Sequence, residues 1–501
     1  MAPAVNVVIL GGGTAGWMTA AALSRLLDPQ AYSFTLVESD AIGTVGVGEA
    51  TLPHIKQFND LLGIDEAAFM RATRATFKLG IEFRGWGAES YIHPFGTFGE
   101  SWGGLEFQHH WTRARLNGLD VAPFQAYSFA VAASLANRFA FPDEDQASIR
   151  SSYAYAYHFD AGLYAAFLRE RAERQGVRRV EGEVAEVKLN PQSGQVESLL
   201  LKSGAVVRGD IFIDCSGFRA VLLGAVNAPW EDWTPWLPCD RALAVPSARA
   251  ADFSPYTRST AQTAGWTWRI PLQHRTGNGY VYASAFTSDD QAHDTLMQAI
   301  DGRPAAEPRL LRFAAGRRTV SWSRNVIGIG LASGFLEPLE STSIYLIQQA
   351  VIALAELMPK AHPDPRLTAE FNRRVGAEYD RVRDFLILHY HANSRHGEPL
   401  WDHCRAMAIP DSLAHKIELF RGRGYVPVYR DGLFARDSWL SVLMGQGIAP
   451  HGYDRLADGI DLARLGERFA ELKIRIDSRV TDMPAHDAFI ARYCGIEEVV
   501  S

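Results

Sequence analysis

The stretch VNVVIL at residues 5–10, followed by GGGTAGW at residues 11–17, decides the fold. VNVVIL is a short run rich in β-branched residues, which is typical of a buried central strand. Gly11, Gly13 and Gly16 then give the spacing G-x-G-x-x-G, and the helical pattern TAGWMTAAALSRLL follows. A strand, a glycine turn and a helix in this order predict the start of a dinucleotide-binding domain.

Each part of this segment has a physical role in holding a dinucleotide. The first glycine permits a tight turn, the second lets the backbone approach a pyrophosphate, and the third lets the helix pack against the strand. The helix start offers N–H groups and a positive dipole end to phosphates. A second predicted strand, SFTLVES, ends near an acid that can accept from ribose hydroxyls. The predicted cofactor-binding residues here are Gly11, Gly13, Thr14, Ala15, Gly16 and Glu38; the alternative is a purely structural glycine turn.

The order of the later segments favours FAD over NAD. Residues 43–51 (GTVGVGEAT) form a second glycine-rich stretch, which adds Glu49 and Ala50 as candidates. Residues 158–176 show a helical pattern, and short alternating strands follow, ending in DCSG with Asp214 as its first residue. This order is that of FAD-dependent oxygenases, whereas NAD enzymes show a more continuous βαβαβ run. DCSG can also be a simple strand-ending turn.

Residues 325–344 (NVIGIGLASGFLEPLESTSI) predict another strand, a glycine-rich turn and a helix start. We expect Gly334 in this turn to lie on the cofactor side. The backbone amides of Thr342 and Ser343, at the helix start, are candidates for binding a small anion. The alternative is that these hydroxyl residues only cap the helix.

Composition excludes several classes of function. The chain has 501 residues, 47% of them apolar, and a net charge of −7, which argues against a nucleic-acid partner. Its four cysteines lack CxxC spacing, which suits a reducing cytoplasm and indicates neither disulfides nor a zinc site. There is no apolar run long enough to span a membrane and no signal peptide, so we expect a cytoplasmic enzyme.

Residues 265–271 read GWTWRIP, which contains the pattern W-x-W-x-I-P. Together with GGGTAGW, this pattern resembles the flavin-dependent halogenases of the tryptophan-halogenase type. Supporting motifs are GVGEAT (46–51), FKLG (77–80), HPFG (93–96) and FLEPLEST (335–342). The resemblance extends at least over residues 7–345.

The resemblance implies a mechanism and a set of roles. The family receives reduced FAD from a separate NAD(P)H-dependent flavin reductase, uses O2 and a chloride or bromide ion, and produces hypohalous acid, which reaches an aromatic substrate through a tunnel. Lys78 of FKLG corresponds to the catalytic lysine, and Glu340 of FLEPLEST to its partner carboxylate. The halide is expected at the amides of Thr342 and Ser343. Many members read S-T-G-I where this chain reads S-T-S-I, which bears on the shape of the halide site.

The same resemblance addresses the substrate. His93 and Phe95 correspond to residues that line the indole site, and Trp266 and Trp268 to a wall between flavin and substrate. Relatives that act on tryptophan hold its amino-acid end with a Tyr-Tyr pair and an acid. The comparable stretch, SWLSVLMGQGIAP (438–450), has neither, and Trp439 stands there instead. We therefore expect indole or another small aromatic without a zwitterionic head. Core packing is the alternative role for all three tryptophans.

We expect an α/β protein with a Rossmann-like FAD-binding fold as in flavin monooxygenases. The FAD-binding body is predicted at 1–360, with substrate-side insertions at about 81–155 and 226–320, and a mostly helical region at 361–501. No metal site is expected, because the sequence HYH places its histidines on different helix faces. Two other functions stay open: an aromatic hydroxylase with its own NAD(P)H reduction, and a catalytically silent FAD-binding protein.

Overall fold

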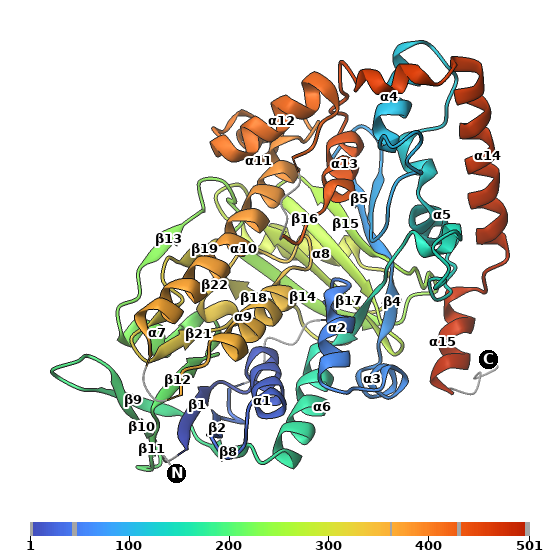
Figure 1. The fold of residues 1–501 in the computed structure, drawn as a ribbon. Helices are drawn as coiled ribbons and strands as arrows, with labels where there is room; N and C mark the ends of the chain where they lie inside the picture. Colours follow the sequence, from blue (N-terminus) through green and yellow to red (C-terminus); the bar gives the residue numbers. More distant parts are fainter. Residues whose placement is uncertain (1–3, 43–47, 361–362, 428–431, 496–501) are drawn as a thin grey trace. The chain divides into compact units, whose positions relative to one another are not determined.

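The computed structural model describes residues 4–42, 48–360, 363–427 and 432–495 (Figure 1). The chain forms two compact units, each built from three separate stretches of sequence. The first unit comprises Met1–Ala75, Phe159–Asp240 and Arg312–Asp380, and the second comprises Thr76–His158, Arg241–Leu311 and Arg381–Ser501.

The first unit is built on a six-stranded sheet with β1 near its centre. Its strand order is β20 (Trp322–Ser323), β21 (Val326–Gly328), β12 (Ile211–Asp214), β1 (Val5–Leu10), β2 (Tyr32–Glu38) and β8 (Arg178–Glu181). β1 runs parallel to both β2 and β12, so the chain order reverses at β1. Ligands of doubly wound sheets bind at such a reversal, beyond the carboxyl ends of the strands.

Helices cover this sheet much as the sequence predicts. α1 (Thr14–Leu26) follows the glycine turn, and α6 (Ala161–Arg174) and α9 (Ser343–Leu357) pack against it. The helix expected over 158–176 begins only at residue 161, because residues 158–160 complete strand β7 (Ala156–Asp160). The Asp160 carboxylate then caps α6 by accepting from the N–H groups of Gly162 and Leu163.

Smaller elements complete the first unit. β9, β10 and β11 form an antiparallel sheet, and β13, β19 and β22 form another. The bounds are β3 (Gly48–Ala50), β9 (Val184–Leu189), β10 (Val196–Leu201), β11 (Val206–Arg208), β13 (Trp230–Asp232), β19 (Gly316–Arg318), β22 (Gly334–Phe335), α2 (His54–Leu61), α3 (Glu66–Thr73), α7 (Val221–Ala225) and the 3-10 turns η3 (Gly217–Arg219) and η4 (Gly330–Ala332). α10 (Pro365–His391) contributes its residues up to Asp380.

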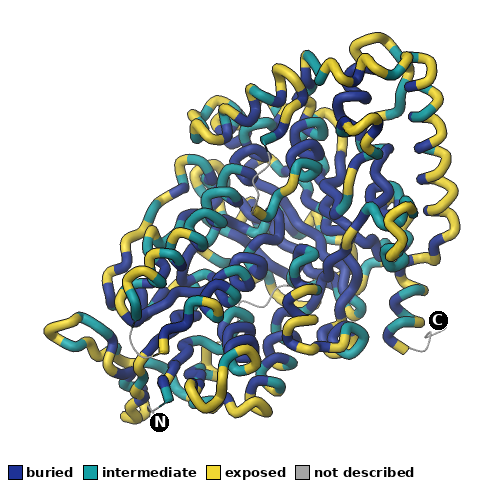
Figure 2. The backbone as a smooth tube through the Cα atoms, viewed as in Figure 1, coloured by how far each residue is buried: buried dark blue, intermediate teal, exposed yellow. Residues whose placement is uncertain are grey.

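The second unit is built on a seven-stranded, largely antiparallel sheet. Its order is β18 (Arg309–Arg312), β14 (Arg241–Ala248), β17 (Arg275–Tyr282), β16 (Gly265–Pro271), β15 (Thr257–Gln262), β5 (Gly80–Arg84) and β6 (Tyr91–Pro94). Figure 2 shows these strands as mostly buried, and every residue of β16 is buried. β4 (Thr76–Lys78) pairs antiparallel with β7.

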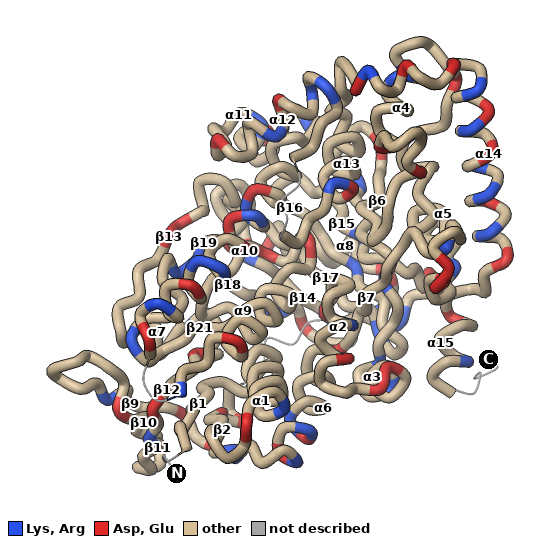
Figure 3. Tube along the Cα trace, in the orientation of Figure 1, with Lys and Arg blue, Asp and Glu red and all other residues tan. Residues whose placement is uncertain are grey.

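The helices of the second unit include most of the C-terminal region. They are α4 (Phe107–Leu116), α5 (Phe129–Leu135), α8 (Asp289–Ala299), α11 (Pro399–Ala406), α12 (Asp411–Arg423), α13 (Arg436–Gly445), α14 (Leu462–Thr481) and α15 (His486–Cys494), with 3-10 turns η1 (Phe124–Tyr127), η2 (Ile149–Ser151) and η5 (Arg455–Gly459). Basic and acidic residues are interspersed along α14 (Figure 3). None of the helices in the described ranges has the length and apolar character needed to cross a bilayer.

Candidate functional site

The glycine turn between β1 and α1 is packed too closely for larger residues. Gly11 has a φ of 114°, and a Cβ there would lie 2.3 Å from the carbonyl oxygen of Cys215 in the DCSG turn. A Cβ on Gly16 would lie 1.8 Å from the carbonyl oxygen of Gly11. α1 has no side-chain cap at Gly13, so its first N–H groups, including those of Ala15 and Thr14, lack intrahelical partners. The turn is therefore suited to a phosphate group.

Glu38 lies beside this turn, at the end of β2. A Cβ on Gly12 would lie 1.4 Å from its Oε2 atom. Arg179 Nε donates to Oε1 at 2.5 Å, and Trp17 Nε1 donates to Oε2 at 3.4 Å. The long Trp17 contact leaves Oε2 with acceptor capacity.

Asp214 is fully buried at the end of β12, and burial raises its pKa. Its carboxylate accepts from the Ser216 N–H and hydroxyl at 3.0 and 2.6 Å, and from the N–H groups of Leu222 and Leu223 at 2.7 and 2.8 Å. These bonds shape the DCSG turn and hold the start of α7. The Asp214 side chain thus stabilises the DCSG turn, which packs against Gly11; we call the turns around Gly11, Gly13 and Gly16 the glycine cradle. The Asp214 carboxylate oxygens already accept hydrogen bonds from protein donors.

The glycine-rich turn within residues 325–344 packs against both the GGGTAGW turn and the DCSG turn. The N–H of Ile329 donates to the carbonyl oxygen of Asp214 at 3.0 Å, and a Cβ on Gly330 would lie 2.9 Å from the Cβ of Ala15. Gly334 packs under Tyr379, whose hydroxyl donates to the Gly334 carbonyl at 3.2 Å. Three of the four glycine-containing segments singled out in the sequence, those at 11–17, 214–217 and 325–344, therefore converge at the carboxyl ends of β1, β12 and β21. Close backbone approach and open helix N–H groups fit a dinucleotide such as FAD.

Glu49 and Ala50 lie in β3, beside residues 43–47 of the predicted glycine stretch, which fall outside the described residues. Burial and the neighbouring Asp160 carboxylate raise the pKa of Glu49 to about 7. Glu49 can thus change charge near neutral pH.

The segment before α9 is buried and strained. Glu340 has no exposed surface, and Ser341 holds a φ of 59°. Thr342 occupies the N-cap of α9 without a side-chain cap bond, and Ser343 begins the helix. The serine that replaces the family's glycine therefore lies in ordinary helical backbone, and the strained dihedral is two residues earlier. The main-chain N–H groups at this helix start remain candidates for a halide.

Lys78 ends β4 in the second unit and is completely buried. Its Nζ lies 5.0 Å from the centre of the Phe95 ring, a cation–π distance. The Phe95 ring in turn meets His93 edge-on at 6.4 Å. The motifs FKLG and HPFG therefore bring their predicted residues together around one ammonium group.

Sequence reasoning missed the aromatic side chains beyond His93. Phe385 of α10 meets His93 at 5.6 Å, stacks on Phe434 at 3.8 Å and contacts the edge of Trp439 at 5.0 Å. Lys416 of α12 places its Nζ 4.1 Å from the Trp439 ring, and burial lowers the pKa of this lysine to about 8. Trp439 is 4% exposed, so it belongs to a packed aromatic cluster. The Lys416 ammonium lies against its ring.

Trp266 and Trp268 point to one face of β16. Their rings are 6.1 Å apart, and Trp266 Nε1 donates to the hydroxyl of Tyr390 at 3.1 Å. Gly279 on the neighbouring strand leaves room for Trp268, since a Cβ there would lie 2.1 Å from its ring. A hydrogen bond thus orients Trp266, and the Trp268 ring packs over Gly279 of the neighbouring strand.

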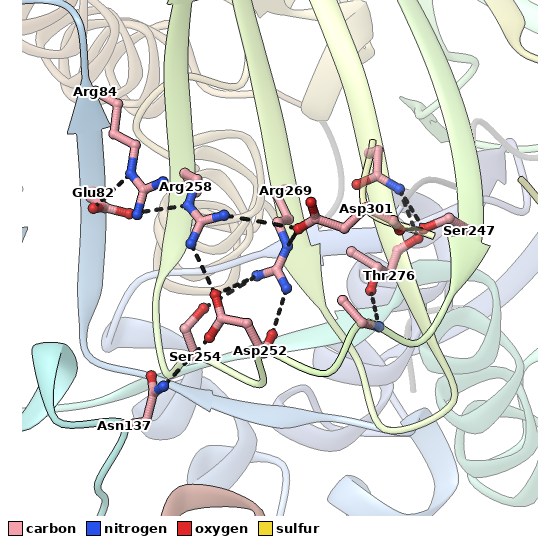
Figure 4. Close-up of polar contacts among 12 residues, drawn as sticks. Glu82, Arg84, Asn137, Ser247, Asp252, Ser254, Arg258, Arg269, Thr276 and Asp301 are labelled. Atoms are coloured by element: carbon pink, nitrogen blue, oxygen red, sulfur yellow. Dashed lines mark hydrogen bonds and ion pairs between the residues drawn. The ribbon is translucent and has the colours of Figure 1, made fainter. Parts of the chain in front are cut away.

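The opposite face of β16 carries an ion-pair network whose arginines lie largely buried and whose aspartates are exposed (Figure 4). Arg269 Nε lies 2.8 Å from Asp301, and Arg258 contacts Glu82 at 3.2 Å and Asp252 at 2.9 Å. Arg269 and Arg258 are opposite one another across the β15–β16 pair. The network therefore ties three sheet strands and two loops together behind the tryptophans.

No group of three or more His, Cys, Asp or Glu side chains within the described ranges could hold a metal ion. Of the residues predicted from the sequence, the first unit holds the glycines, Glu38, Glu49, Ala50, Asp214, Glu340, Thr342 and Ser343. The second unit holds Lys78, His93, Phe95, Trp266, Trp268 and Trp439.

Comparison with known proteins gives consistent matches over most of the chain. The family model described as tryptophan halogenase matches residues 6–461. Tryptophan 6-halogenase SttH of Streptomyces toxytricini is 36% identical over 518 residues, covering 97% of this chain and 98% of that protein. Among solved structures, BrvH, a flavin-dependent halogenase from Brevundimonas sp. BAL3, has a TM-score of 0.94 and 43% identity, covering 98% of this chain and 99% of its own. A flavin-dependent halogenase from Xanthomonas campestris has a TM-score of 0.94, 45% identity and the same coverage.

Proposed function

Because the chain belongs to the tryptophan-halogenase family of flavin-dependent enzymes, we propose that it halogenates an indole-type substrate by way of hypohalous acid. The observation that carries this proposal is Lys78, an ammonium buried against the ring of Phe95. Family membership does not favour the hydroxylase considered from the sequence.

The cofactor of the family is FAD, and the glycine cradle of the first unit would hold it. Gly11 would permit the tight turn, Gly13 would let the backbone approach the pyrophosphate, and Gly16 would let the helix pack against the strand. The N–H groups of Thr14 and Ala15 would bind the pyrophosphate, and Glu38 would accept from the ribose. When bound in reduced form, FAD supplies the electrons that activate O2. We propose that a separate NAD(P)H-dependent flavin reductase delivers the reduced flavin, and that both proteins work in the cytoplasm.

The protein's own residues do the rest of the chemistry. The main-chain N–H groups of Thr342 and Ser343 would bind chloride or bromide. Lys78 would donate a hydrogen bond from its ammonium to the oxygen of hypohalous acid, which makes the halogen more electrophilic. In the alternative, the deprotonated amine of Lys78 would take the halogen from hypohalous acid, with release of water. Glu340 would orient the reagent or take the proton that the ring loses on substitution. Trp266 and Trp268 would separate flavin from substrate, while His93 and Phe95 would stack on the aromatic ring.

We propose that the substrate lacks the amino-acid head of tryptophan. Residues 438–450 contain no tyrosine or acid. Instead, Lys416 sits over Trp439 with its Nζ donating to the Pro427 carbonyl at 3.2 Å. A second ammonium beside this lysine would be repelled, and it would have no carboxylate partner from this stretch. Indole or an indole with a neutral or anionic substituent suits these surroundings better.

The test combines the protein with FAD, a flavin reductase, NADH, bromide or chloride, and either indole or tryptophan. Mass spectrometry should show a halogen isotope pattern on indole, with a larger kcat/KM than for tryptophan. Lys78→Met should lower the halogenation rate by about 10²- to 10⁴-fold. The control is Lys56→Met, which removes an exposed lysine paired with Asp60 on α2. A hydroxylated product that forms without halide, or full activity in Lys78→Met, would refute the proposal.

A further inference from the structure

The strand that carries Lys78 has an unusual partner on its outer edge. Among the described residues β4 is an edge strand that pairs with β7, with Phe77 opposite Tyr157. The N–H of Phe77 points away from β7 and donates to Nε2 of His486 at 3.2 Å. Phe77 is completely buried and His486 is 1% exposed. Without the imidazole, the Phe77 N–H would therefore be a buried donor that lacks this acceptor.

The second ring nitrogen of His486 joins another backbone segment. Because Nε2 accepts from Phe77, the proton lies on Nδ1, which donates to the carbonyl oxygen of Phe253 at 3.0 Å. The Phe253 ring also stacks on the imidazole at 5.2 Å. Burial lowers the pKa of His486 to about 4, which keeps the ring neutral and its acceptor available.

This histidine comes from the C-terminal helix of the described chain. α15 begins at His486, and its Phe489 and Tyr493 pack around Phe77 at 5.6 and 6.1 Å. The family model ends at residue 461, before α15, whereas the solved structure of BrvH covers 98% of this chain. The residue before Lys78 is thus held by a helix 409 positions away in sequence.

We propose that His486 is a positioning residue for Lys78, acting through the Phe77 backbone. This inference rests on the proposed function of Lys78. Lys78 is the residue after Phe77, so the imidazole fixes the Thr76–Phe77 peptide, one residue before the Cα that carries the lysine side chain. A displacement of about 1 Å at a reacting group can lower a rate about 100-fold. Losing the His486 acceptor should therefore affect turnover more than substrate binding.

Three variants separate positioning from packing. His486→Ala removes both hydrogen bonds. His486→Gln restores an amide that can accept from Phe77 and donate to Phe253. Phe489→Leu is the matched control, because it loosens the same helix against the same Phe77 ring but leaves the imidazole bonds in place. Each is assayed as the full-length, FAD-loaded enzyme with a flavin reductase, bromide and indole.

We expect His486→Ala to lower kcat about 10- to 100-fold with the KM for indole within about twofold of wild type. We expect His486→Gln to recover most of the loss. A second readout is independent of activity: hydrogen exchange in the peptide containing Phe77 should be about tenfold faster in His486→Ala and slow again in His486→Gln.

The outcomes distinguish this inference from the proposed function. Wild-type protein that binds FAD but yields no bromoindole would overturn the proposed function, and this inference with it. A wild-type kcat in His486→Ala, in an otherwise active enzyme, would overturn only the inference. A loss of kcat equally large in Phe489→Leu would also overturn it, because packing alone would then explain the effect.

Discussion

The hydroxyl of Thr76 donates a hydrogen bond to the carbonyl oxygen of Pro271 at a distance of 2.8 Å. Thr76 begins the strand of Lys78, and Pro271 ends the W-x-W-x-I-P motif, so one bond links the two segments. Since this hydroxyl uses its proton on Pro271, it accepts from Nδ1 of His158 at 3.1 Å. The Nε2 atom of His158 then accepts from Thr257 at 2.9 Å. Burial holds the pKa of His158 well below its usual value, in keeping with a neutral ring.

Replacing Thr76 with valine tests this link. Thr76→Val keeps the side-chain shape but leaves two buried polar atoms, the Pro271 oxygen and His158 Nδ1, without this partner. We expect a loss of about 1–3 kcal/mol in the free energy of unfolding, measured by urea denaturation. Thr76→Ser keeps the hydroxyl and should lose only about 1 kcal/mol, from the missing methyl group. Equal stability of the valine variant and wild type would show that the bond is not a structural link.

The glycine cradle predicts a contrast between two alanine substitutions. In Gly16→Ala the new Cβ would overlap the backbone oxygen of Gly11 at 1.8 Å, which no side-chain rotation can relieve. We expect FAD affinity to fall about tenfold or more and the protein to lose about 1–3 kcal/mol of stability. Gly224→Ala is the control, since its Cβ meets open space in α7 and should stabilise the helix by about 0.5–1 kcal/mol. A fluorescence titration with FAD measures the first effect; unchanged affinity in Gly16→Ala would contradict the cradle.

The parts of the fold that could be predicted from the sequence are those set by local pattern. β1 occupies Val5–Leu10 and α1 starts at Thr14, because β-branched residues and the glycine turn determine both. The helix expected from residue 158 was wrong at its start, since residues 158–160 extend the strand that pairs with β4. The local sequence around residues 158–160 is compatible with either a helix or a strand. Pairing with β4, which is distant in sequence, selects the strand.

The missing parts of the candidate site depend on contacts between distant residues. Phe77 and His486 are 409 positions apart, and no spacing rule connects them. Lys416 lies in an ordinary amphipathic helix, and only the folded chain places it over Trp439. Motif resemblance predicted Lys78 and Phe95 as functional residues, and the structure shows that they are in contact. It could not predict the groups that hold them.

The segment before α9 predicts opposite effects at two serines. Ser341→Gly should raise the free energy of unfolding by about 1 kcal/mol, because glycine adopts a φ of 59° without strain. Ser343→Gly should lower it by about 0.5–1 kcal/mol, because Ser343 is helical. Main-chain N–H groups survive in both variants, so the ratio of chlorinated to brominated product should stay within about twofold. A large change in that ratio for Ser343→Gly would show that the side chain, rather than the amide, shapes the halide site.

Glu49 predicts a specific pH dependence of stability in the apoprotein. Its folded pKa of about 7 lies above the value of 4.5 for a free glutamate, so the folded state holds the proton more tightly. The protonated Glu49 therefore contributes at most about 3 kcal/mol to the free energy of unfolding. This stabilisation is fully present below pH 4.5 and is lost as pH rises through about 7. Glu49→Gln cannot ionise, so the stability difference between wild type and variant should shift by that amount between pH 4.5 and 8, measured by urea denaturation at each pH. Parallel stability curves for the two proteins would contradict the raised pKa, and a difference that grew in favour of wild type with pH would reverse its sign.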